Sequence, residues 1–144
     1  MSVDWFSDMK AMHQKFGVNT WMKQQIDDGN IDTLRKYLSF RLLMINEELA
    51  ETFSAALVQG DSEEVVDGLI DLCVFAIGTL EVLGVDAHKA WDTILNANMA
   101  KEPGVKAERP NKFGLPDLIK PLGWKNPNHK GNHGDIPMIL GEQQ

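Results

Sequence analysis

The chain of 144 residues has little cysteine, no early proline and no long apolar run, and each shortage excludes something. Its single cysteine, Cys73, lies among apolar residues, so no internal disulfide is possible and an inert core thiol is expected. All six prolines follow residue 102, which leaves the first hundred residues free to be helical. The longest apolar run, 72–80, is too short to span a membrane. Since the N-terminal residues also lack a signal-peptide pattern, we expect a cytoplasmic protein.

Acidic side chains outnumber basic ones, and the formal net charge is −7. Residues 1–100 hold 16 acids against 7 Lys and Arg, whereas residues 101–144 hold 5 acids and 7 bases. An acidic body argues against a nucleic-acid partner, because the phosphate backbone is bound by basic surfaces. We therefore expect neither nucleic acid nor a membrane as a partner.

Apolar residues in the first hundred positions recur every three or four residues, a spacing typical of amphipathic helices. Glycines 17, 60 and 84 are expected to end helices, and Asp61 and Asp86 to cap the helices that follow. The helices expected from these signals cover residues 4–16, 20–28, 32–58, 61–83 and 87–101. We predict an all-α, four-helix-bundle-like fold in a single domain, 1–144. Its helical core is 1–101, and its loop-rich tail, 102–144, is expected to pack on the bundle and to fray over its last ten residues.

Two clusters of carboxylates interrupt segments that are otherwise typical of buried helix. At 100° per residue, Glu48 and Glu51 are neighbours on one helix face, and Asp67 and Asp71 stack one turn apart. Two antiparallel helices joined near Gly60 would bring both pairs to a similar height. That height is about 10–15 Å from the turn at a rise of 1.5 Å per residue. The sequence therefore predicts that the four acids face one another.

Acids that converge in a core repel one another, and a divalent cation relieves the repulsion. Carboxylate oxygens are hard ligands, and these favour Mg²⁺, for which Mn²⁺ can substitute. We predict a metal site formed by Glu48, Glu51, Asp67 and Asp71. Glu64 is a reserve ligand, because it also stands where a capping box begun by Asp61 would place its acid.

Other interpretations of these residues remain. The chain could be a non-catalytic helical module that assembles through its apolar faces. A di-iron bundle is disfavoured, because no Glu is followed by His three residues later. His13 is expected to be structural, and His129 with His133 lacks a third ligand for zinc.

The acid pattern, together with the segment 96–101 (Asn-Ala-Asn-Met-Ala-Lys), resembles the all-α nucleoside triphosphate pyrophosphohydrolases. That superfamily includes MazG, the dimeric dUTPases and phosphoribosyl-ATP pyrophosphohydrolase. The likeness is greatest to small MazG-like proteins, often phage-encoded. It extends from about residue 41 to 124, where Lys-Pro-x-Gly-Trp adds a second motif. It implies a MazG-type helical core.

The family pattern is Glu-x-x-Glu, a spacer, then Glu-x-x-Asp, and this chain fits it in two ways. If Glu64 and Asp67 are the last two ligands, Asp71 is an additional acid. If Asp71 is the last ligand, Gly68 stands where the family has Glu, and Asp67 must substitute. The downstream residues 77–86 favour the second alignment.

The resemblance implies metal-dependent hydrolysis of a (deoxy)nucleoside triphosphate to the monophosphate and pyrophosphate. Glu47 or Glu64, when not bound to metal, would accept a proton from the attacking water. Lys101 would place a positive charge on the phosphates, and Asn98 would form a hydrogen bond to sugar or phosphate. The resemblance also implies a homo-oligomer, either a tetramer built as a dimer of dimers or a dimer. It would work in the cytoplasm, or in the host cytoplasm if the chain is phage-encoded.

Overall fold

A computed structural model describes residue 2 and residues 4–142, and the chain divides into two compact units. The first unit comprises residues 1–87 and 133–144, and the second comprises residues 88–132. Helices dominate the first unit, and the strands among the described residues are two short ones of three residues each, both in the second unit. The predicted all-α fold is confirmed, whereas the single domain over 1–144 stays a prediction.

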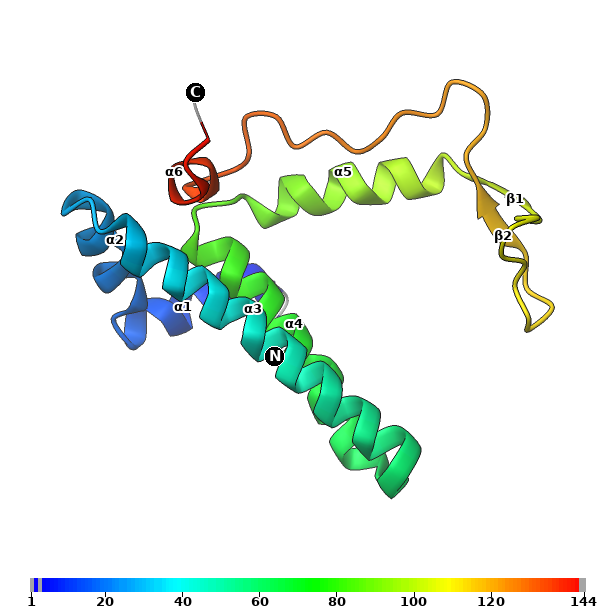
Figure 1. Ribbon diagram of the computed structural model, residues 1–144, viewed down its shortest axis with the longest axis horizontal. Coiled ribbons are helices and arrows are strands. Elements are labelled where there is room, and N and C mark those ends of the chain that lie inside the picture. The colour runs from blue at the N-terminus through cyan, green and yellow to red at the C-terminus, as the bar shows by residue number, and fades with distance from the viewer. Residues whose placement is uncertain (1, 3, 143–144) are drawn as a thin grey trace. The chain divides into compact units, whose positions relative to one another are not determined.

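The first unit is built on a long antiparallel helix pair (Figure 1). Four of the expected helices are present with ends shifted by a few residues, and a fifth short helix joins them. The pair consists of α3 and α4, and α1 and α2 precede it along the chain. The helices are α1 (Trp5–Lys15), α2 (Val18–Asp27), α3 (Ile31–Ser54), α4 (Ser62–Val82) and α6 (Ile136–Leu140). After α3 the chain continues as a π-helix, η1 (Ala55–Gln59), which ends at Gly60 with a left-handed φ of 67°.

The core of the first unit is closed by α6. Leu34, Leu83 and Ile139 are fully buried and pack together with Met22 and Val82. The Arg35 Nε atom donates to the Ile139 carbonyl at 2.7 Å. The expected fraying of the last ten residues is therefore wrong for the described part, because the apolar segment 136–140 completes this core instead of remaining in solvent.

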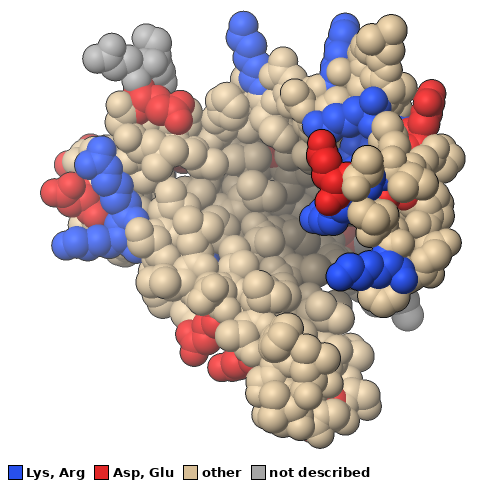
Figure 2. Space-filling view, turned by 45° about the vertical axis from the view of Figure 1, so that its right-hand side comes forward, with Lys and Arg blue, Asp and Glu red and all other residues tan. Residues whose placement is uncertain are grey.

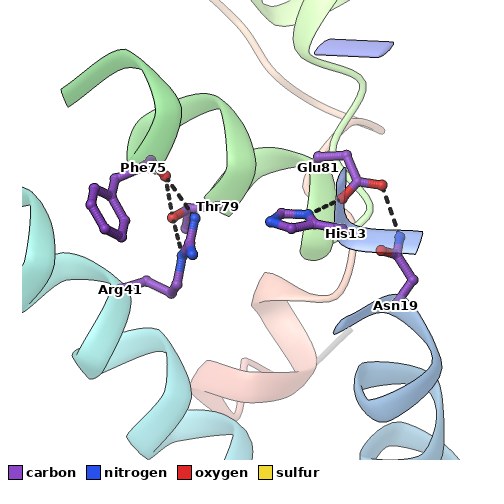
Figure 3. Close-up of polar contacts among 6 residues, drawn as sticks. All are labelled: His13, Asn19, Arg41, Phe75, Thr79 and Glu81. Atoms are coloured by element: carbon purple, nitrogen blue, oxygen red, sulfur yellow. Dashed lines mark hydrogen bonds and ion pairs between the residues drawn. The ribbon is translucent and has the colours of Figure 1, made fainter. Parts of the chain in front are cut away.

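Buried polar contacts join α1, α2 and α4 (Figure 3). His13 Nδ1 lies 2.5 Å from a Glu81 carboxylate oxygen, and both side chains are only 4% exposed. The Asn19 amide donates to the other Glu81 oxygen at 2.9 Å. The structural role expected of His13 follows from these contacts, because a buried polar group needs a partner.

Arg41 joins α3 to α4 a short distance away (Figure 3). Its Nε donates to Thr79 Oγ1 at 3.0 Å, its Nη2 donates to the Phe75 carbonyl at 3.2 Å, and its guanidinium lies 5.1 Å from the Phe75 ring centre. Gly78 makes room for this contact, since a Cβ there would lie 2.8 Å from both Arg41 Nη2 and Met9 Cε. Arg41 therefore fixes how α3 sits on α4.

The second unit consists of a helix, a small hairpin and the following loop. The helix is α5 (Ala87–Met99), and β1 (Glu102–Gly104) pairs antiparallel with β2 (Asp117–Ile119). The sequence predicted only loops here, because three-residue strands are too short to show an alternating pattern. After the hairpin, Trp124 Nε1 donates to the Ala97 carbonyl at 2.7 Å, which ties the loop to α5.

Membrane-spanning helices need a long and apolar stretch. Taken singly, none of the described helices is long and apolar enough to cross a bilayer, although α4 and α5 taken together pass on length and composition.

Candidate functional site

A cavity of about 320 Å³ lies at the helix pair, close to the link around Gly60. Besides polar residues of α3 and η1, it is lined by five of the six acids that the sequence singled out. These are Glu48, Glu51, Glu64, Asp67 and Asp71. The sixth acid, Glu47, is exposed on α3 and does not line the cavity. The structure thus brings both acidic clusters to one place.

The two helices approach closely at this cavity because residue 68 is glycine. A Cβ at Gly68 would lie 2.1 Å from Thr52 Oγ1 and 3.2 Å from Thr52 Cβ. The Thr52 hydroxyl itself donates to the Glu48 carbonyl at 2.7 Å, one turn earlier in α3. A glutamate at position 68, as one alignment with the family would require, would not fit against Thr52. Asp67 and Asp71 therefore supply acids on either side of the close contact.

Glu64 does not act as the acid of a capping box, the alternative role that made it a reserve ligand. Asp61 caps α4 by accepting from the backbone N–H groups of Glu63 and Glu64, at 3.0 and 3.2 Å. The N–H of Asp61, which a reciprocal capping box would bond to the Glu64 side chain, donates instead to the Ala55 carbonyl at 3.0 Å. The Ala55 carbonyl, at the start of the π-helix, thus accepts the hydrogen bond that the Glu64 side chain would accept in a capping box. The Glu64 carboxylate lines the cavity instead.

The acids are less buried than we expected from the apolar residues that flank them in the sequence. Glu48 and Asp71 are half-buried, and Glu51, Glu64 and Asp67 are exposed. In the first unit α6 packs near Leu34, and α1 packs on α4 between Ile70 and Gly78 without lining the acidic cavity. The expectation of core acids is wrong for the single chain, because the acid-bearing ends of α3 and α4 form an open two-helix hairpin (Figure 1).

Like charges set the electrostatics of the cavity. Partial desolvation raises the pKa of Glu48 above its usual range, and the nearby carboxylates of Asp71, Glu51, Glu47 and Asp67 raise it further. Among the described residues, no three His, Cys, Asp or Glu side chains converge closely enough to hold one ion as they stand. Repulsion between unneutralised carboxylates favours such separation. The donors suit a hard cation by their oxygen chemistry and shared cavity, but they must turn inward to share it.

The two predicted substrate-binding residues lie together in the second unit. Lys101 follows the last residue of α5, Met99, and its Nζ donates to Asn98 Oδ1 at 2.8 Å, so the two side chains are in contact. Lys101 also lies 5.6 Å from the centre of the Trp124 ring, and Lys120 lies 4.5 Å from it. The sequence assigned no role to Lys120 or Trp124. The signal that could have found them is the Lys-Pro-x-Gly-Trp motif, which holds both.

Comparison with known proteins places this arrangement in a family. The model of the phosphoribosyl-ATP pyrophosphohydrolase family matches residues 18–98, which is more than half of the chain. The matched region includes both acidic clusters and Asn98. The chain therefore belongs to this family, within the MazG-like nucleotide pyrophosphohydrolase superfamily, and the family implies nucleotide pyrophosphohydrolase activity. Among curated proteins, no match was found.

Proposed function

We propose that this protein hydrolyses a (deoxy)nucleoside triphosphate to the monophosphate and pyrophosphate in the presence of Mg²⁺, with Mn²⁺ able to substitute. The observation that carries the proposal is the gathering of five carboxylates from two helices at one cavity, in a chain of a pyrophosphohydrolase family. Partial desolvation and the neighbouring carboxylates raise the pKa of Glu48, and a bound cation would offset both effects.

In this mechanism the acids divide into ligands and a base. Glu48, Glu51, Asp67 and Asp71 would hold the ion, which when bound supplies a water of lowered pKa and polarises phosphate oxygens. Of the two acids predicted to accept the proton of that water, Glu64 lines the cavity and Glu47 does not, which favours Glu64.

We further propose that the protein is a homo-oligomer, because α3, η1 and α4 expose many large apolar side chains. Those more than half exposed are Phe40, Leu42, Leu43, Leu49, Phe53, Leu57, Val58, Val66 and Leu69. Monomeric soluble proteins rarely leave so much apolar surface in contact with water. A second copy that covered these faces would also bury the acids more deeply. Sedimentation equilibrium gives the mass directly, and a monomer at micromolar concentration would contradict the proposal.

The activity is tested by measuring pyrophosphate release from each nucleoside triphosphate with Mg²⁺. We expect Asp71→Asn to lower kcat by about 100-fold or more, because even an outer-shell partner of a metal is worth 10–100-fold. Asp27→Asn is the matched control, since Asp27 is an exposed acid on α2 that pairs with Lys23. Unchanged turnover in folded Asp71→Asn would remove Asp71 from the ligand set. Absence of pyrophosphate from every nucleotide with the unaltered protein would contradict the activity itself.

A further inference from the structure

In the second unit, two lysines share one indole ring. Lys120 Nζ lies 4.5 Å and Lys101 Nζ lies 5.6 Å from the centre of the Trp124 ring, distances at which an aromatic ring attracts a cation. The ring is itself fixed, because its N–H donates to the Ala97 carbonyl on α5 at 2.7 Å. Trp124 thereby holds two positive charges near each other.

No acid neutralises these two charges within the described residues, where neither lysine forms an ion pair. The hydrogen bond of Lys101 goes to the neutral amide of Asn98. Figure 2 shows several Lys and Arg side chains, with some Asp and Glu among them, on its right-hand side, the side that carries the two strands in Figure 1. Cations held together without a counter-charge repel one another, and a bound anion would remove that cost.

A hollow of about 600 Å³ adjoins the ring in the same unit. Its size falls within the usual range for small-molecule sites, about 300–1,000 Å³. Asn96, Asn126 and Asn128 line it together with Trp124 and Lys125, and no acid is among its lining residues. Amide groups can both donate to and accept from the edge of a heterocycle, and the indole offers an apolar surface.

We propose that this hollow is the nucleotide-binding element of the protein. Lys101 and Lys120 bind the phosphate chain, the amide-lined hollow receives the base, and Trp124 is a positioning residue that holds both ammonium groups. This inference rests on the proposed function, which makes the bound nucleotide the substrate. It adds Lys120, Trp124 and the base site, to which neither the sequence nor the family match assigns a role.

The test measures binding on the Asp71→Asn background, which suppresses turnover and leaves the second unit intact. The probes are the four common dNTPs and inorganic tripolyphosphate, with Mg²⁺, titrated by calorimetry. We expect Lys120→Gln to raise the Kd of the best-bound dNTP and of tripolyphosphate about tenfold, the effect of one charged hydrogen bond. Asn126→Ala should raise the Kd of the dNTP only. Lys130→Gln, an exposed lysine of the same unit, is the control and should change neither.

The role of Trp124 and the catalytic consequence are tested in the active protein. Lys120→Gln should raise KM with little change in kcat, and Trp124→Leu should do the same, whereas Trp124→Phe, which keeps an aromatic ring, should restore most of the loss. Wild-type affinity in both Lys120→Gln and Asn126→Ala would overturn this inference while leaving hydrolysis untouched. Conversely, the expected Kd pattern without any pyrophosphate release would sustain the binding site and contradict only the proposed activity.

Discussion

Because α3 and α4 approach closely at Gly68, we predict an unusual effect of Gly68→Ala on stability. Replacing glycine by alanine inside a helix normally stabilises a protein by up to about 1 kcal/mol, because alanine has the better helix propensity. Here the new Cβ would lie 2.1 Å from Thr52 Oγ1, well inside contact distance. The threonine cannot turn away cheaply, since its hydroxyl donates to the Glu48 carbonyl. The sign of the effect should therefore be reversed.

The expected change in the free energy of unfolding is the steric cost of the new Cβ less the gain in helix propensity. Overpacking a well-packed contact costs about 1–3 kcal/mol. After the gain in propensity, Gly68→Ala should lower the free energy of unfolding by up to about 2 kcal/mol. For a chain of this length, each kcal/mol changes Tm by about 2–4 °C, so Tm should fall by up to about 8 °C. Denaturant unfolding followed by circular dichroism measures both quantities.

A double variant isolates the cause. Thr52→Ala removes the Oγ1 atom and leaves the Cβ of residue 52 at 3.2 Å from the new methyl group, a contact that small shifts can relieve. In the Thr52→Ala background, Gly68→Ala should be neutral or stabilising. If Gly68→Ala raised the Tm of the otherwise unaltered protein, the helices would not be in contact at this point.

Two further predictions concern charged groups. His13→Ala should cost about 3–5 kcal/mol in urea unfolding, because it leaves the buried Glu81 carboxylate with Asn19 as its one remaining side-chain partner among the described residues. The matched control Lys23→Ala breaks an exposed pair with Asp27 and should cost less than about 1 kcal/mol, so equal losses would refute the buried pairing. Because the pKa of Glu48 is raised, its ionised form opposes folding, so Glu48→Gln should not lower the Tm of the metal-free protein. Protons compete with Mg²⁺ for Glu48, so affinity should fall as pH falls through that pKa, and an identical pH slope in Glu48→Gln would exclude Glu48 as a ligand.

Helices and shared faces were predictable, because both follow from local spacing. The three- and four-residue steps located α3 and α4, and the turn at Gly60 was enough to bring Glu48 and Asp71 to one cavity. The contact between Asn98 and Lys101 is also local, since the Lys101 N–H donates to the Asn98 carbonyl in the turn that follows α5.

What escaped prediction depends on contacts between distant segments. Leu69 and Ile70 flank Asp71 and suggested a core, yet they are themselves exposed, because an apolar pattern does not reveal what covers it. The π-helical turn after Ser54 depends on how α3 joins α4 and has no propensity signal. The burial of Ile139 depends on Leu34 and Leu83, which lie far away along the chain and which no local pattern connects to it.

The position of Ile139 in the core has a consequence for how the protein is made. Leu34 and Leu83 leave the ribosome well before the residue that completes their packing. At about 5–20 residues per second, translation reaches Ile139 roughly 3–11 seconds after Leu83. During that interval the nascent chain carries an unfinished apolar surface, so the first unit acquires its full stability only late in synthesis, after the whole second unit has been translated.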